Sequence, residues 1–318
     1  MTGGLLAVHA HPDDETLATG ALLATWAAAG RPVTVVTATR GERGEVIGRR
    51  WAHLEGDGPA LAAHREDELA AALRALGVRD HGFLDEAVAA DVRYEDSGMA
   101  WVGAGRAGAP DDVPDDAFAF APLEEAADAL ARLLRSRRPA VVVTYEPGGG
   151  YGHPDHVRAH DVTALALQLA AREDDTYSPA HVVPVVLWSV AGRVALRRAQ
   201  VALAGDAVLA ALGATIEHLT LPDPAAEPPS MAVPDDEVDL LVDVAPVRDR
   251  VLAALRAHAT QVQAVRPVAG EDALVGCYAL SNAVLAAVPA AEAYRYATGS
   301  LRAEDAGLTW PAGARPVA

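Results

Sequence analysis

The sequence predicts an α/β fold, with a Rossmann-like, mostly parallel sheet flanked by helices and a smaller C-terminal α+β subdomain. Short apolar runs typical of buried strands alternate with helical runs through the first two thirds of the chain, and the last third changes character. The strand-like runs lie near residues 5–9, 33–38, 82–84, 140–145 and 183–189, and the helical runs near 14–29, 61–76, 123–136 and 155–172. This alternation implies βαβ units with right-handed crossovers.

Individual segments carry their own signals. Leu5 to Val8 and Ala140 to Thr144 are continuous apolar runs, as expected of parallel strands covered on both faces. The helical run 62–76 ends at Gly77, which is a C-cap candidate. Its apolar face is formed by Leu69, Ala72, Leu73 and Leu76.

The last third contains an irregular, proline-rich crossing from Pro222 to Pro234. A strand is expected next at 238–242, and a helix from about 247 to 262. We therefore expect two units, a Rossmann-like domain over residues 1–190 and a smaller subdomain over residues 191–318.

Two segments rich in Gly, Pro, Asp and Glu, residues 41–60 and 86–122, are expected to be long loops. Long loops within compact domains often line a functional site. Both segments are therefore candidates for contacts with a substrate.

The composition excludes several function classes. The formal net charge is −18, and all 26 basic residues are arginines because the sequence contains no lysine. A Schiff-base lysine and a Walker-type phosphate loop are therefore excluded. The acidic balance also argues against nucleic acid or an anionic membrane as a partner, since both need clustered positive charge. A small, neutral or weakly charged substrate fits better, and the oligomeric state is left open.

Cysteine use and the N-terminus point to the cytoplasm. Cys277 is the only cysteine, so no intramolecular disulfide can form. The first residues run directly into a strand without a basic segment or cleavage site, and no run of ~18 apolar residues could span a bilayer. We expect a cytoplasmic protein.

Two His-Pro-Asp tripeptides are the most informative local feature. One lies in Ala10-His11-Pro12-Asp13-Asp14-Glu15 and the other in His153-Pro154-Asp155-His156, and each follows a predicted strand and opens a helical run. Ligands of open α/β sheets bind beyond the carboxyl ends of the strands. Three imidazoles and three carboxylates would converge there, which a purely structural role rarely requires. The pattern predicts a metal site. Residues 1–190 would then be the metal-binding catalytic domain, and residues 191–318 a subdomain that contributes to the substrate crevice.

Each motif alone has a structural explanation, because acidic residues complement a helix dipole and His-Pro is common in turns. The combination favours metal binding. His11 and Asp14 are three residues apart, as are His153 and His156, and this spacing brings side chains to one side of a turn. Catalytic zinc sites take three N and O ligands. If one residue stays free as a base, Asp13 is the better candidate, and His153 can then stand on the far side of the metal.

The chain resembles the zinc-dependent de-N-acetylases of the LmbE/PIG-L family, through the two signatures above and further segments. Within that family it is most similar to the branch that removes acetate from N-acetylglucosaminyl-inositol in mycothiol biosynthesis, whereas residues 100–122 and 172–235 match nothing recognisable. The further matching segments are Gly41-Glu42-Arg43-Gly44-Glu45-Val46-Ile47-Gly48, Leu73-Arg74-Ala75-Leu76-Gly77-Val78, Asp96-Ser97-Gly98-Met99, Gly149-Gly150-Tyr151-Gly152, His258-Ala259-Thr260-Gln261-Val262 and Ala279-Leu280-Ser281-Asn282.

The resemblance implies one Zn²⁺ per chain, held by His11, Asp14 and His156, although Fe²⁺ or Co²⁺ would also suit such donors. It makes Asp13 the general base. His153, if protonated, would stabilise the oxyanion or act as general acid, and Tyr151 would add a hydrogen bond. Asp155 is expected to orient a neighbouring histidine.

The resemblance also implies contacts with an amino-sugar substrate. Arg65 and Asp96 match positions that hold sugar hydroxyls, Glu45 lies in the matching loop, and Gln261 lies near a helix end. Without the resemblance, Arg65 within Arg65-Glu66-Asp67-Glu68 would be read as part of a solvated helix face.

Other activities stay open at this point. A mycothiol S-conjugate amidase is disfavoured because that branch carries a lysine shortly after the first signature, where this chain has Thr16-Leu17-Ala18-Thr19. A metal-dependent phosphoesterase would need further bridging carboxylates. A sugar-binding protein without catalysis would not need both Asp13 and His153.

Overall fold

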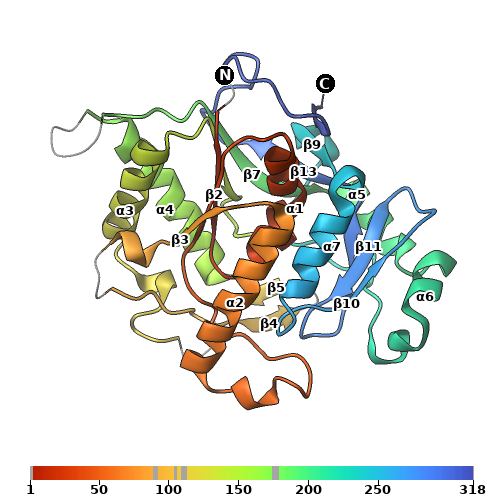
Figure 1. Cartoon of the computed structure of the whole chain (residues 1–318). Helices are drawn as coiled ribbons and strands as arrows, with labels where there is room; N and C mark the ends of the chain where they lie inside the picture. Colours follow the sequence, from red (N-terminus) through yellow and green to blue (C-terminus); the bar gives the residue numbers. More distant parts are fainter. Residues whose placement is uncertain (1–2, 89–91, 104–105, 109–112, 174–178, 318) are drawn as a thin grey trace.

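A mostly parallel sheet forms the centre of the molecule (Figure 1). The structure is a computed structural model and describes residues 3–88, 92–103, 106–108, 113–173 and 179–317. The strands of the central sheet are β1 (Leu5–His9), β2 (Val33–Thr37), β3 (Asp80–Phe83), β6 (Val141–Tyr145), β7 (Val185–Gly192), β8 (Ala232–Val233), β9 (Leu240–Asp243), β13 (Ala291–Tyr296) and β14 (Ala314–Pro316). Their order is β14-β9-β13-β7-β6-β1-β2-β3, and β8 pairs with the end of β7.

The pairing direction changes along this sheet. β1 is parallel to both β2 and β6, whereas β13 is antiparallel to β7 and β9. The strands from the first two thirds of the chain thus form the parallel part, and strands from the last third extend it antiparallel. The predicted fold class, a mostly parallel α/β sheet flanked by helices, is confirmed.

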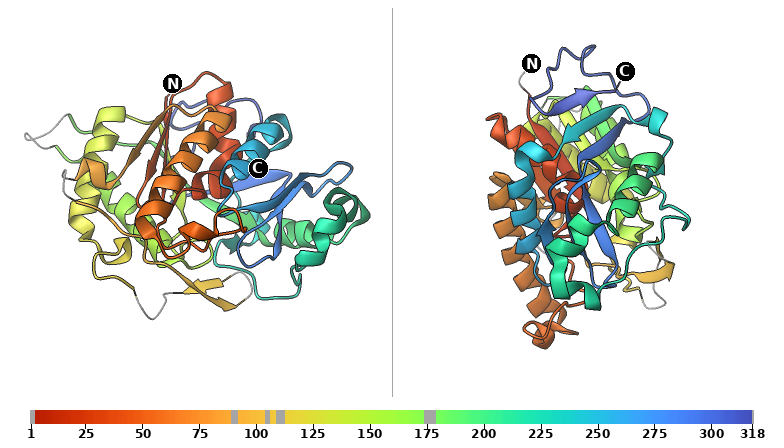
Figure 2. Two further views of the ribbon diagram at one scale, coloured as in Figure 1. Left: turned by 60° about the horizontal axis from the view of Figure 1, so that its bottom comes forward. Right: turned by 90° about the vertical axis from the view of Figure 1, so that its right-hand side faces the viewer.

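Helices cover both faces of the sheet (Figure 2). Helices α1 (Asp14–Ala28), α2 (Gly58–Leu76) and α7 (Arg248–Ala257) pack on one face, and α3 (Leu123–Arg137) and α4 (Pro154–Ala171) on the other. Successive residues of a strand pack into the cores on opposite faces of the sheet, because side chains alternate along a strand. Leu5 and Ala7 of β1 join the first core, and Leu6 and Val8 join the second.

A smaller unit lies beside the central sheet. Strands β10 (Gln263–Pro267), β11 (Leu274–Ala279) and β12 (Leu285–Pro289) form an antiparallel sheet. It shares a third core with helices α5 (Arg193–Ala202) and α6 (Asp206–Leu212). The predicted boundary between residues 190 and 191 falls inside β7, and β9, β13 and β14 from beyond it complete the central sheet.

The predicted elements of the first two thirds are present, with bounds shifted by a few residues. The helix expected over 247–262 is too long: α7 ends at Ala257. The next residues leave the helix because their side chains bond to other elements: His258 bonds to Glu15 of α1, and the Thr260 hydroxyl donates to Glu68 of α2. Segment 86–122, expected to be a loop, contains the short antiparallel strands β4 (Ala100–Gly103) and β5 (Arg106–Gly108).

In the part of the chain that the structure describes, no single helix is long and apolar enough to cross a bilayer. The helical segments Arg193–Ala202 and Asp206–His218 are bent relative to each other. By length and composition alone, the two together would be long and apolar enough.

Candidate active site

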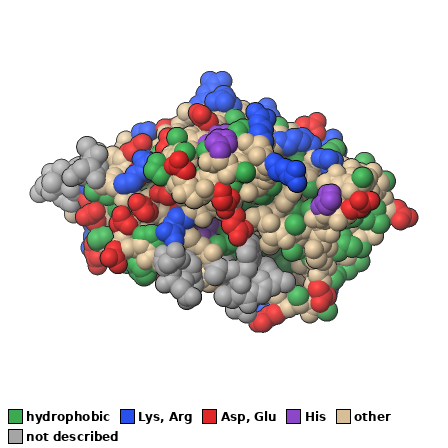
Figure 3. Space-filling model, turned by 90° about the horizontal axis from the view of Figure 1, so that it is seen from below, with side chains coloured by type: hydrophobic (Ala, Val, Ile, Leu, Met, Phe, Trp, Pro, Cys, Tyr) green, Lys and Arg blue, Asp and Glu red, His purple; other side chains and the backbone are tan. Residues whose placement is uncertain are grey.

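The two His-Pro-Asp segments meet at one point of the sheet edge. The first follows β1 and leads into α1, and the second opens α4. β1 lies between β2 and β6, so the strand order reverses beside it. Such a switch point, at the carboxyl ends of parallel strands, is where α/β sheets bind ligands. Figure 3 views this end of the molecule, where acidic and basic side chains are interspersed.

Asp14 lies between two imidazole nitrogens. Its Oδ2 is 3.2 Å from His11 Nδ1 and 3.2 Å from His156 Nε2, and all three side chains are buried. Donor atoms of a tetrahedral zinc with bonds of about 2.0 Å lie about 3.3 Å apart, so each pair has a spacing that suits a shared cation. Burial raises the pKa of Asp14, but His156 and His11 outweigh burial and hold this pKa well below its usual value.

In each of these two histidines, the ring nitrogen that faces away from Asp14 makes a hydrogen bond, and this bond orients the ring. His156 Nδ1 lies 3.2 Å from the Gly149 carbonyl and donates to it, so Nε2 keeps its lone pair. That Nε2 is buried without a hydrogen-bond partner among the described residues. His11 Nε2 donates to Asp155 Oδ2 at 3.0 Å, so Nδ1 is the nitrogen that faces Asp14. His11 Nδ1 and His156 Nε2 thus both face Asp14 Oδ2, an arrangement that suits a shared cation.

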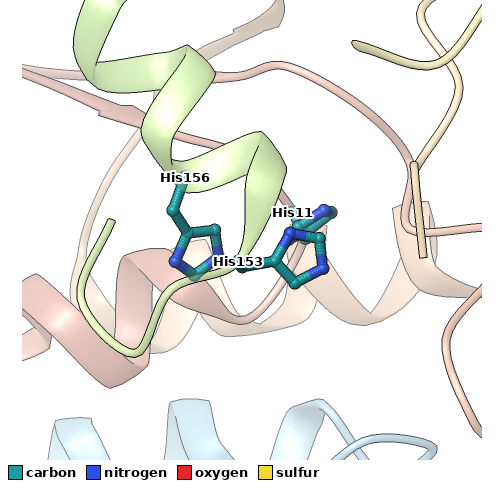
Figure 4. Close-up of side chains that lie close together, drawn as sticks. All are labelled: His11, His153 and His156. Carbon is teal, nitrogen blue, oxygen red and sulfur yellow. The ribbon is translucent and has the colours of Figure 1, made fainter. Parts of the chain in front are cut away.

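His153 stands beside this set, with its ring next to those of His11 and His156 (Figure 4). Within the described residues, donor atoms within 4.8 Å of one another form two sets, His11, His153 and His156, and His11, Asp96, His153 and Asp155. His153 Nδ1 accepts the Asp155 backbone N–H at 3.2 Å, so a neutral His153 ring carries its proton on Nε2. It is therefore better suited to donate a hydrogen bond than to coordinate a metal.

The pKa of His153 is lowered well below its usual value, first by burial and then by His11 and His156. The ring is therefore neutral near pH 7, whereas the oxyanion role was predicted for a protonated ring. A neutral Nε2–H still donates. Tyr151 lies nearby, with its ring centroid 5.0 Å from that of His156 and 6.2 Å from that of His153.

Asp13 is next to the candidate ligands but points to Arg65. Its Oδ2 lies 3.2 Å from Arg65 Nη2. Burial raises the pKa of Asp13 to about 7, although Arg65 lowers it. A carboxylate with a pKa near the working pH is well matched to accept and return a proton.

Asp155 and Asp96 both face His11. Asp155 Oδ2 accepts from His11 Nε2 and from the Ser97 backbone N–H at 2.9 Å, so it contacts the histidine ring that it was predicted to orient. Asp96 Oδ1 lies 3.4 Å from His11 Nε2 and accepts the Gly98 N–H at 2.8 Å. Asp96 was predicted to hold a sugar hydroxyl. In the structure it is buried beside His11, and it is only 3% exposed.

Arg65 is not part of a solvated helix face, since it is 3% exposed. Its guanidinium donates to the carbonyls of Gly41 and Pro12 as well as to Asp13. Gln261 is also buried and donates to the Glu45 carbonyl at 3.2 Å, whereas the Glu45 side chain is exposed. The structure thus brings the loop that begins at Gly41 and the segment after α7 to the same site.

Tyr145 is a site residue that the sequence analysis missed. Its ring stacks on His156 with centroids 4.1 Å apart, and its hydroxyl accepts the Ala10 N–H at 2.9 Å. Burial raises the pKa of this hydroxyl well above its usual value. Its place as the last residue of a strand that leads to the site was the available signal, but the sequence analysis took Tyr145 only as the end of the strand-like run 140–145.

Replacing Tyr145 with phenylalanine keeps the ring on His156 and leaves the buried Ala10 N–H without its acceptor. We expect the free energy of unfolding to fall by about 1–3 kcal/mol, measured by chemical denaturation. Tyr296→Phe is the matched control, because the Tyr296 hydroxyl accepts a backbone N–H, that of Ala303, in a less buried place. An equal loss in both variants would contradict the importance of burial at Tyr145.

Comparison with known proteins places this site in a context. The sequence profile described as "PIG-L: GlcNAc-PI de-N-acetylase" matches residues 6–167. The chain is 47% identical over 299 residues to the 1D-myo-inositol 2-acetamido-2-deoxy-alpha-D-glucopyranoside deacetylase of Kineococcus radiotolerans, covering 93% of this chain and 77% of the relative. It is 42% identical over 320 residues to a deacetylase of the same description from Saccharopolyspora erythraea, covering 98% and 97%.

Among solved structures, the 4-carboxy-2-hydroxymuconate hydratase of Pseudomonas putida has the same fold. The TM-score is 0.51 at 17% sequence identity, over 94% of this chain and 98% of that chain. A likeness at this identity concerns the fold alone.

Proposed function

Because this chain belongs to the PIG-L family of de-N-acetylases, we propose that it hydrolyses the N-acetyl group of 1D-myo-inositol 2-acetamido-2-deoxy-alpha-D-glucopyranoside. The products are the free glucosaminyl-inositol and acetate, a reaction of mycothiol biosynthesis. One observation carries the proposal: the two His-Pro-Asp segments bring a carboxylate and two oriented imidazoles together in one buried site, with a second carboxylate beside them.

The residues present fit a divalent metal. His11 Nδ1 and His156 Nε2 face Asp14, which supplies an anionic oxygen, and this His₂Asp set matches the donors of catalytic zinc sites. When bound there, zinc would lower the pKa of a water molecule and polarise the amide carbonyl. We infer zinc from this donor set and from the family.

Asp13 acts as the general base. With a pKa near 7, its carboxylate takes the proton of the attacking water as the new C–O bond forms. It can then return that proton to the nitrogen, so that the C–N bond breaks and the free amine leaves with acetate as the second product. Arg65 holds the Asp13 carboxylate from one side.

His153 and Tyr151 act on the amide oxygen. The His153 Nε2–H is the donor that remains once Nδ1 accepts from Asp155, and a neutral donor still stabilises negative charge that develops on that oxygen. The Tyr151 hydroxyl stays protonated, because burial raises its pKa well above the usual value, and it supplies a second donor.

The sugar is held by Asp96, Arg65, Gln261 and Glu45 in this proposal. Glycine at position 44 allows two of them to approach, because a Cβ there would lie 2.7 Å from Arg65 Nη1 and 2.9 Å from Gln261 Oε1. We therefore expect Gly44→Ala to displace both side chains and to lower kcat/KM about tenfold or more, measured by initial rates.

Gly58→Ala is the matched control for that variant, since its Cβ would meet the Glu42 carbonyl at an ordinary 3.6 Å. A Gly44→Ala enzyme with unchanged kcat/KM would show that Arg65 and Gln261 do not contact the substrate.

Acetate and amine release by the zinc-loaded protein tests the activity. N-acetylglucosaminyl-inositol is compared with free N-acetylglucosamine and a mycothiol S-conjugate. We expect the fastest release from the inositol glycoside. A preference for the S-conjugate would place the chain in the amidase branch, and no release from any substrate would contradict the proposed function.

A further inference from the structure

Asp13 has an unusual backbone conformation, with φ 119° and ψ −32°. A residue with a side chain rarely adopts a positive φ, and it does so stably only where the surroundings hold it. The residue proposed as general base is therefore held in place by contacts beyond its own side chain.

The Glu15 carboxylate supplies one of these contacts. Its Oε2 accepts the Asp13 backbone N–H at 2.9 Å. Its Oε1 accepts from the Thr16 hydroxyl and from His258 Nε2, the latter at 2.8 Å. Glu15 and His258 are both fully buried, so this pair is shielded from water.

His258 comes from a distant part of the chain, just after α7. The same segment is fastened to α2 by Glu68, whose carboxylate accepts the Thr260 N–H at 2.8 Å and the Thr260 hydroxyl at 2.7 Å. The C-terminal third thus reaches Asp13 through His258 and Glu15, and α2 anchors the segment that makes this contact.

We propose that His258 is a positioning residue for the general base: through Glu15 it holds the Asp13 backbone in the conformation that aims the Asp13 carboxylate. The proposal rests on the proposed function, because it concerns the base of that reaction. Stability alone is a weak explanation for the pair, since a buried ion pair can often be replaced by apolar residues without loss. The Glu15–His258 pair instead contacts the backbone N–H of Asp13, a site residue with a strained backbone.

Two substitutions at position 258 separate positioning from packing. His258→Leu fills the space but cannot donate to Glu15, and we expect kcat to fall by about 10- to 100-fold, with KM and zinc content unchanged. His258→Gln places an amide N–H close to the position of Nε2 and should recover most of kcat. If the leucine variant does not fold, His258→Asn replaces it, because its shorter amide does not reach Glu15.

Glu15→Gln tests whether the two residues act as one unit. If they do, His258→Leu combined with Glu15→Gln should lower kcat no further than the more damaging single variant. Additive losses would overturn the proposal. His181→Leu is the control. It also removes a buried histidine, but this histidine bonds the Pro139 carbonyl away from the site, so kcat should not change.

Amide hydrogen exchange at Asp13 gives a readout that does not depend on activity. We expect exchange at least about tenfold faster in His258→Leu and wild-type exchange in His258→Gln. Wild-type kcat and exchange in the leucine variant would overturn the proposal. If the wild-type protein hydrolyses no substrate, the proposed function fails, and the exchange result still decides whether His258 holds Asp13.

Discussion

We expect Asp13→Asn to leave zinc bound and to lower kcat by about 10²- to 10⁴-fold, the range for losing a general base. Asparagine keeps the size of the side chain and tolerates a positive φ better than most residues, which matters at φ 119°. Its amide cannot accept the proton of water at neutral pH. Zinc should stay because Asp13 is not among the proposed ligands. The measurements are kcat with the inositol glycoside and zinc content by elemental analysis.

Asp13→Ala should behave in the same way, with an added loss of stability from the strained backbone. Asp67→Asn is the matched control, because it makes the same change of charge at an exposed position of α2 and should keep wild-type activity. Near-wild-type turnover in Asp13→Asn would show that another group takes the proton.

His156→Ala should lose both zinc and turnover. The variant removes the nitrogen that has no hydrogen-bond partner among the described residues, and only His11 and Asp14 of the proposed ligands remain. Two protein ligands hold catalytic zinc poorly compared with three. Zinc bound per chain after dialysis is the measurement, with activity on added zinc as the second readout.

His160→Ala is the matched control for metal content. His160 lies one turn further along α4, is also buried, and bonds the Tyr145 carbonyl at 2.9 Å. We expect this variant to keep its zinc. Stoichiometric zinc in His156→Ala would refute the proposed ligand set.

Much of the site could be predicted from the sequence because the topology of parallel strands is regular. Once the runs before His11 and His153 are read as neighbouring parallel strands, their carboxyl ends must meet at one edge of the sheet. The strand order confirms that β1 and β6 are neighbours. The spacing within each motif then brings His11 to Asp14 and places His153 beside His156.

The residues that sequence reasoning missed act through contacts between distant segments. Tyr145 touches Ala10, and His258 touches Glu15, across separations that no local pattern records. Arg65 was predicted as a site residue only through the family resemblance, because its run of charged residues is typical of a solvated helix face. In the structure it is buried and donates to the Gly41 carbonyl and to Asp13. The end of α7 was misplaced for the same reason, because bonds to α1 and α2 outweigh local helix propensity there.

The extent of the central sheet was also underestimated, since the strand expected at 238–242 is present as β9 but β13 and β14 were not predicted. The short strands β9, β13 and β14 pair antiparallel with one another or with β7, and their partners are far apart in the sequence. Strands of this kind give weaker periodic signals than long amphipathic helices. The predicted domain division after residue 190 therefore cut through a sheet that continues to the C-terminal residues.

The central claim is that His11, Asp14 and His156 hold a catalytic metal, and anomalous diffraction from zinc-loaded crystals tests it most directly. We expect one strong zinc peak per chain, in contact with His11 Nδ1, the Asp14 carboxylate and His156 Nε2, with His153 outside bonding distance. A peak bound instead by His153, Asp96 and Asp155, or no peak at this site, would contradict the account.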